Sequence, residues 1–150
     1  MSIRDNYLEI LKRKDAAAKR SGRNPEDVML MAVTKKHEPD ELREAIDAGA
    51  TDFGENKVQE LLSKYDEVHP KRWHLIGHLQ TNKVRQIIDK VTMIHSVDSL
   101  KLAREINKRA AAAGVVMDVL IEINLAEEES KTGISKGEVQ ELIESIVSEC

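Results

Sequence analysis

"DVMLMAVTKKHEPDELREAIDAGATDFGEN" (residues 27–56) contains one complete strand–helix–strand unit and decides the fold class. Residues 27–34 form an apolar run of the kind found in strands buried on both faces. Pro39 then suits the first turn of a helix over 39–49. A second short strand follows at 51–56. This succession predicts a parallel βαβ unit.

The same alternation continues along the rest of the chain. After an N-terminal helix over about residues 2–21, strands begin roughly every 20 to 25 residues, each followed by a helix. The pattern favours an α/β fold, either an open doubly wound sheet or a (β/α)₈ barrel. We expect strands at 27–34, 51–56, 72–77, 92–97 and 117–124, and helices after them at 39–49, 57–68, 81–90, 98–114 and 135–149.

Two of these helices carry capping signals. Asp98 or Ser99 is expected to cap the start of helix 98–114, and Gly114 to end it. Ser135 with Glu138 three residues later predicts a capping box at the start of the last helix.

Composition indicates one soluble globular domain over residues 1–150. The 150 residues are 41% hydrophobic and 33% charged, which suits a single core. With 23 Lys and Arg against 27 Asp and Glu, the net charge of -4 gives no electrostatic case for nucleic acid or an acidic membrane. No stretch approaches the roughly 20 apolar residues of a membrane span. The one cysteine, Cys150, excludes a disulfide framework and a Cys-based metal site, so we expect a cytoplasmic protein.

Polar side chains follow each expected strand, at the edge of a parallel sheet where sites are built. No strand is followed by G-x-G-x-x-G or G-x-x-x-x-G-K-[ST], so a nucleotide-type phosphate loop is not indicated. The polar residues are Lys35, Lys36, Glu55, Asn56, His78, Gln80, Ser96, Asp98 and Asn124.

The two lysines after the first strand admit two interpretations. A lysine at a strand end forms a Schiff base with a carbonyl compound if partial desolvation lowers its pKa from about 10.4. The ordinary alternative is a surface lysine whose stem lies along an apolar rim. Because successive strand side chains point to opposite faces, Lys35 and Lys36 cannot both face a barrel interior. The alternation by itself does not choose between them.

Four stretches in order carry the motifs of a known family. They are "AVTKKHEPDELREAIDAGATDFGENKVQE" (32–60), "WHLIGHLQTNKVR" (73–85), "IHSVDSLKLA" (94–103) and "INLAEEESKTGI" (123–134). They closely resemble the pyridoxal phosphate homeostasis protein family, single-domain relatives of the N-terminal barrel of alanine racemase. The resemblance covers nearly the whole chain and implies a (β/α)₈ TIM-barrel type fold.

The resemblance also implies a binding site for pyridoxal 5′-phosphate (PLP). In the family, the lysine of A-V-[ST]-K forms the internal aldimine with PLP, which implies Lys35 and leaves Lys36 at a variable place. The F-G-E-N motif implies that Asn56 lies beside the cofactor. The W-H-x-I-G motif implies that Ile76, Gly77 and His78 line the site. No catalytic residue and no metal ligand is assigned.

These residues also have ordinary structural interpretations. His78 would serve equally as a hydrogen-bonded junction residue, and Asn56 as the cap of the helix after it. Trp73 and His74 are expected in the core or an interface rather than at the cofactor.

The resemblance implies a PLP carrier for intracellular homeostasis that holds the cofactor on Lys35, releases it to PLP-dependent apo-enzymes and has no established turnover. An amino-acid racemase is the enzymatic alternative, but it needs a second acid–base group, and Tyr7 and Tyr65 are both outside the strand ends. An aldolase-like Schiff-base enzyme would need Glu55 as a partner of Lys35. A chain that binds no cofactor remains the purely structural alternative.

The chain supplies about five βα-units, whereas a (β/α)₈ barrel typically has about 250 residues. The serine-rich and R-I-G segments that hold the cofactor phosphate in the family are missing. We therefore expect an incomplete barrel domain, part of a longer gene product, with weak or absent PLP binding. Its unpaired strand edge and exposed apolar residues favour a homo-oligomer or a rearranged edge.

Overall fold

The computed structural model describes residues 2–150, which form a five-stranded, fully parallel sheet in the order β1-β2-β3-β4-β5. The order follows the sequence without the reversal that defines a doubly wound sheet, so the arrangement is that of a barrel. The strands are β1 (Met31–Val33), β2 (Asp52–Glu55), β3 (Arg72–Leu75), β4 (Met93–Val97) and β5 (Asp118–Ile121).

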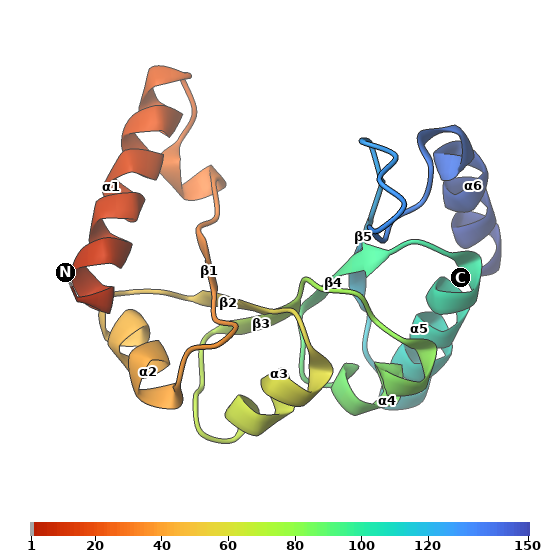
Figure 1. The fold of residues 1–150 in the computed structure, drawn as a ribbon, viewed down its shortest axis with the longest axis horizontal. Helices are drawn as coiled ribbons and strands as arrows, with labels where there is room; N and C mark the ends of the chain where they lie inside the picture. The colour runs from red at the N-terminus through yellow and green to blue at the C-terminus, as the bar shows by residue number, and fades with distance from the viewer. Residues whose placement is uncertain (1) are drawn as a thin grey trace.

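Helices cover one side of the curved sheet and both of its ends. Figure 1 shows α2 to α5 along the outer side of the strands, with α1 and α6 at opposite ends of the molecule. The fold is therefore part of a TIM-type α/β barrel. The helices are α1 (Ile3–Arg20), α2 (Pro39–Asp47), α3 (Val58–Tyr65), α4 (Val84–Ile87), α5 (Leu100–Ala113) and α6 (Val139–Glu149), and short 3₁₀ turns are η1 (Pro25–Asp27), η2 (Thr81–Lys83) and η3 (Lys136–Glu138).

The core lies between the sheet and the outer helices. Phe53, Leu75 and Ile94 project from three neighbouring strands and are fully buried. The ring of Trp73 packs edge-on against Phe53 at a centroid distance of 5.6 Å. Trp73 and His74 are both buried, which confirms their prediction as interior residues.

The other face of the sheet is open. Val33 on β1 and Leu120 on β5 are 48% and 47% exposed. Within residues 2–150, β1 and β5 each pair with one neighbouring strand only. The expected unpaired edges and exposed apolar residues are therefore present.

The predicted elements differ from the observed ones mainly at their ends. The first strand begins at Met31 instead of residue 27, and Pro25–Asp27 before it form a 3₁₀ turn capped by Asn24. The helix predicted over 81–90 consists of the 3₁₀ turn η2 followed by the short helix α4.

One of the two capping predictions is confirmed and the other is wrong. Ser99 Oγ accepts a hydrogen bond from the Leu102 N–H, and α5 ends at Gly114 in the left-handed region with φ 69°. Ser135, in contrast, donates its hydroxyl to the Glu138 carboxylate. The backbone there begins with the 3₁₀ turn η3, so the reciprocal side-chain-to-backbone pair of a capping box is not formed.

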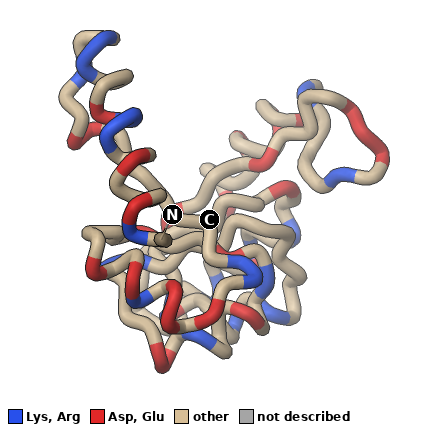
Figure 2. The backbone as a smooth tube through the Cα atoms, turned by 60° about the vertical axis from the view of Figure 1, so that its left-hand side comes forward, with Lys and Arg blue, Asp and Glu red and all other residues tan. Residues whose placement is uncertain are grey.

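Charged residues of both signs are distributed along the whole described chain, as Figure 2 shows. None of the helices between residues 2 and 150 combines the length and the apolar character that crossing a membrane requires.

Candidate functional site

Residues predicted from the resemblance come together at the carboxyl ends of β1, β2 and β3. Val33 is in register with Gly54, and Glu55 with Leu75. The Ile76 N–H donates to the Glu55 carbonyl at 2.9 Å, which extends the β2–β3 pairing one residue further. Lys35, Asn56 and Ile76 therefore follow three adjacent strands at one edge of the sheet.

Gly77 lies directly against the backbone of Asn56. A Cβ atom at residue 77 would stand 2.2 Å from the Asn56 carbonyl oxygen, so the two chain segments approach too closely for any side chain. Asn56 does not cap α3, because the N-cap position is Lys57. The helix-cap interpretation of Asn56 is therefore wrong.

Lys35 and His78 are exposed, and Ile76 is half-buried. Exposure of Lys35 differs from the partial desolvation expected for a strand end inside a closed barrel, because the facing part of the sheet is open. Tyr7 and Tyr65 lie on α1 and α3, so neither stands at a strand end of the described sheet.

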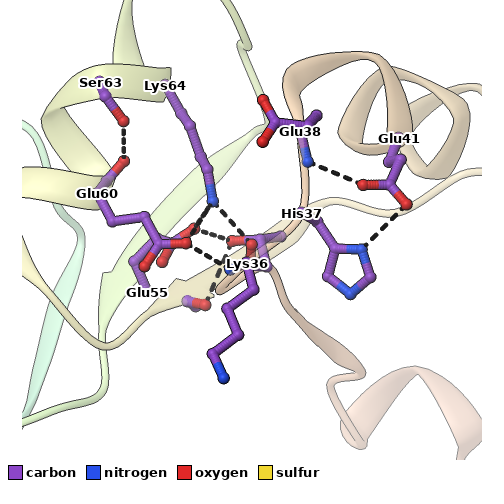
Figure 3. A network of polar contacts seen from close by, with 10 residues as sticks. Lys36, His37, Glu38, Glu41, Glu55, Glu60, Ser63 and Lys64 are labelled. Carbon is purple, nitrogen blue, oxygen red and sulfur yellow. Dashed lines mark hydrogen bonds and ion pairs between the residues drawn. The ribbon is translucent and has the colours of Figure 1, made fainter.

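The chain turns sharply at the two lysines. Thr34 and His37 close a turn in which the His37 N–H donates to the Thr34 carbonyl at 3.2 Å. Lys36, inside this turn, has φ 65°, in the left-handed region that a residue with a side chain seldom adopts. Figure 3 shows the Lys36 side chain extending away from the neighbouring carboxylates.

A buried ion network supports this turn from α3. Lys64 Nζ donates to the Thr34 carbonyl at 2.8 Å, and it also lies 2.7 Å from Glu55 Oε1 and 3.0 Å from Glu60 Oε1 (Figure 3). Glu60 Oε1 in addition accepts the Lys36 N–H. The Thr34 hydroxyl donates to Glu55 Oε1 at 2.6 Å. Glu55 Oε2 is buried without a hydrogen-bond partner in the part of the chain that the structure describes.

Within this network, the pKa values of Lys64 and Glu60 are shifted towards their charged forms. Burial by itself would lower the pKa of Lys64, but the hydrogen bonds and charges of Glu55 and Glu60 outweigh it and raise that pKa. The Lys36 N–H and then Lys64 lower the pKa of Glu60. Lys64 therefore remains an ammonium ion near neutral pH and does not offer a free amine to a carbonyl compound.

A second polar chain crosses the open face of the sheet. Asp52 accepts two hydrogen bonds from Arg72, at 2.5 and 2.7 Å, and one from His74 Nε2 at 2.9 Å. His74 Nδ1 lies 3.0 Å from His95 Nε2. Because Phe53 and Leu75 face the helices, the alternating Asp52 and His74 face the opposite side of the sheet, where both side chains are nevertheless buried.

The surroundings of Asp52 and His95 lower the pKa of both groups. Burial would raise the pKa of Asp52, but hydrogen bonds from Arg72, Thr51 and His74 hold it well below its usual range. Burial, and then the neighbouring His74, lower the pKa of His95.

Sequence reasoning missed both networks. A signal for the first was nevertheless present, because Val58, Leu61 and Lys64 follow one another at helical spacing and are the three buried residues of α3. A lysine on the apolar stripe of a helix is rarely buried unless it is paired. The contacts between Asp52, His74 and His95 have no local signal, because they join three strands.

Glu55 was considered as an acid–base partner of Lys35 in an aldolase-like enzyme. Glu55 is fully buried, and its Oε1 is bonded to Lys64 and Thr34 on the helix side of the sheet. It is therefore not accessible from the open side, and the aldolase-like reading loses its only candidate partner.

The fold is a partial α/β barrel of the TIM type, and Lys35 lies at the end of its first strand. The family model described as "Alanine racemase, N-terminal domain" matches residues 9–149. The chain belongs to this family.

Comparisons with individual proteins agree with the resemblance drawn from the four motifs. The chain is 40% identical over 146 residues to the pyridoxal phosphate homeostasis protein of Aquifex aeolicus, covering 96% of this chain and 64% of that protein. A protein of unknown function from Bifidobacterium adolescentis is 34% identical with a TM-score of 0.84, over 96% of this chain and 63% of that one.

A third relative was solved with a ligand. PipY of Synechococcus elongatus, whose structure has PLP bound, is 31% identical with a TM-score of 0.73, over 91% of this chain and 65% of that one. The chain thus spans slightly less than two thirds of the length of these relatives.

Proposed function

We propose that this chain binds pyridoxal 5′-phosphate through Lys35 and serves in the homeostasis of that cofactor. The observation that carries the proposal is the position of Lys35, an exposed primary amine at the carboxyl end of β1, beside the segments that contain Asn56 and Gly77. The names of the Aquifex relative and of the PLP-bound PipY structure support the same cofactor.

The residues present fit one end of the cofactor. When bound, PLP supplies an aldehyde that condenses with a primary amine to a Schiff base, with loss of one water. Lys35 offers the amine, the half-buried Ile76 an apolar contact, and exposed His78 a hydrogen-bonding ring. Gly77 has no side chain and lies directly against the Asn56 backbone, which brings these two segments of the proposed site together.

We propose that the affinity is weak in this chain. Contacts from the part of the relatives that it does not span would be missing, and a bound phosphate usually depends on several backbone and cationic donors. The Schiff base and the contacts of Ile76 and His78 would then hold the cofactor.

A carrier without turnover is favoured over a racemase. Racemisation needs an acid–base group on each side of the cofactor, and Tyr7 and Tyr65 lie on helices. Glu55 is sequestered by Lys64. We further propose PLP-dependent apo-enzymes as the recipients of the cofactor.

The direct test adds PLP to the purified chain, reduces with borohydride, and maps the modified lysine by mass spectrometry. We expect an adduct on Lys35 that disappears in Lys35→Ala and persists in Lys36→Ala. Adduct on Lys36 instead would move the site by one residue, and scattered labelling would contradict the proposal.

A second measurement separates the carrier from the racemase. We expect no exchange between D- and L-amino acids when PLP and the chain are incubated together. Exchange that is lost in Lys35→Ala would overturn the carrier interpretation.

A further inference from the structure

We propose that Lys64, Glu55 and Glu60 are positioning residues that hold the backbone of the Lys35 turn in the geometry required for cofactor capture. The inference rests on the proposed function of Lys35 and goes beyond it, because none of the three residues would touch the cofactor. We call these three residues the α3–β2 clamp.

The clamp holds the chain on both sides of Lys35. On the N-terminal side, Lys64 Nζ donates to the carbonyl of Thr34 at 2.8 Å. On the C-terminal side, the Glu60 carboxylate accepts the N–H of Lys36. Lys64 and Glu60 are themselves joined at 3.0 Å, so the two attachment points belong to one rigid unit of α3.

Glu55 links this unit to the sheet. Its Oε1 lies 2.7 Å from Lys64 Nζ and 2.6 Å from the Thr34 hydroxyl. The Thr34 N–H in turn donates to the Gly54 carbonyl at 3.0 Å. The turn is thus tied to β2 through one side chain and one backbone bond.

The turn needs such support. Lys36 adopts φ 65°, and a left-handed conformation at a residue with a Cβ persists only where its surroundings fix it. The bond from the Lys36 N–H to Glu60 supplies that constraint. Without this bond, the turn would no longer fix which of the two lysines points towards the site. Both amines are exposed, so either would then be available to the cofactor.

Stability alone does not account for the clamp. Replacing a buried ion pair by neutral or apolar groups of similar size is often neutral or stabilising, because the pair no longer has to be desolvated. Lys64 and Glu55 are nevertheless buried together, with exposed fractions of 5% and 0%. Their position against the Thr34 carbonyl indicates that what they fix is the direction of the turn.

The test compares the wild-type chain with the double variant Lys64→Met, Glu55→Gln, the single variant Glu60→Gln, and the control Lys108→Met, which removes an exposed lysine of α5. Changing both buried partners avoids leaving one unpaired charge in the interior, so the double variant should fold. Each protein is titrated with PLP, reduced with borohydride, and mapped, and its thermal transition is followed by circular dichroism.

We expect the double variant and Glu60→Gln to need about tenfold more PLP for half-labelling of Lys35, the size expected when a charge-assisted hydrogen bond is removed, as in the double variant, or weakened to a neutral one, as in Glu60→Gln. The ratio of Lys35 to Lys36 adducts should fall in parallel, a change that a loss of stability alone would not produce. Exchange of the Lys36 amide proton should become about tenfold faster in Glu60→Gln, whose neutral amide oxygen is a weaker acceptor for that N–H, independently of any cofactor. Lys108→Met should match the wild type in all three measurements.

The outcomes separate the two proposals. Unchanged labelling of Lys35 in a folded double variant would overturn the clamp and leave the proposed function standing. Absence of a Lys35 adduct in the wild-type chain would overturn the proposed function, and the clamp as a positioning device with it.

Discussion

At the scale of single residues, the site depends on a close backbone contact that leaves no room for a side chain. Gly77 is the clearest case, because the position of its missing Cβ is occupied by the backbone of Asn56. The glycine is part of the W-H-x-I-G motif, yet the reason for it is visible only once β2 and β3 are paired. The motif pointed to Gly77 as a site residue, and the structure shows why a glycine stands there.

Gly77→Ala should therefore destabilise the chain. A Cβ at 2.2 Å from the Asn56 carbonyl oxygen forces the β2 and β3 ends apart, at a cost of about 1–3 kcal/mol. Urea denaturation measures the change, and Gly137→Ala is the control, because a Cβ there meets nothing within 4 Å. Equal unfolding free energies for the two variants would contradict the close approach.

The free energy of unfolding should depend on pH because of Asp52. Its folded-state pKa is lowered, whereas in the unfolded chain it returns to about 4. Its stabilising contribution is therefore fully present above about pH 5 and is lost as the pH falls further, since the unfolded state binds the proton first. The advantage of the wild type over Asp52→Asn should shrink between about pH 5 and pH 3.

Unfolding free energies at several pH values between these limits test this expectation. The control is Asp118→Asn, at the exposed start of β5. A difference between wild type and Asp52→Asn that stays constant as the pH falls would show that the Arg72 and His74 contacts do not stabilise the ionised form.

At the scale of elements, local signals were reliable where one residue acts on its own helix. Ser99 and Gly114 begin and end α5 as predicted. Ser135 failed because its hydroxyl binds the Glu138 carboxylate rather than the backbone. The prediction of one helix over 81–90 was inaccurate, because a 3₁₀ turn replaces its first turn.

Ser99→Ala should destabilise the chain by about 1 kcal/mol, the usual cost of removing an N-cap oxygen. The lost contact is the bond from the Leu102 N–H, at 3.2 Å. Ser148→Ala is a matched control on exposed α6, and its effect should stay within about 0.5 kcal/mol. Chemical denaturation of both variants decides whether the Ser99 cap contributes as expected.

At the scale of the whole molecule, the described chain is a half-open barrel with two unpaired strand edges. Its helices cover the outer face only (Figure 1), and large apolar side chains remain on the opposite face. Exposed apolar surface and free edges both favour association. Self-association through this open face therefore stays a prediction for the chain in solution.

Sedimentation velocity tests this prediction. We expect concentration-dependent association of the wild type, and a shift towards monomer in Leu120→Lys, which places a charge on the open face. Val116→Lys is the control, because Val116 is exposed but precedes β5 and lies outside the sheet. A compact monomer at all concentrations would contradict the predicted association.

The sequence by itself determined the alternation of strands and helices, two of the helix ends, and the lysine motif, because these signals act within a few residues of one another. The alternation alone left open whether the sheet is doubly wound or barrel-like; the family resemblance implied a barrel, and the order β1-β2-β3-β4-β5 confirmed it. Only the tertiary structure joined Lys64 to Thr34, 30 residues apart, and His74 to Asp52, 22 apart. Such contacts depend on which strands become neighbours and which face each side chain takes, and no local pattern encodes either.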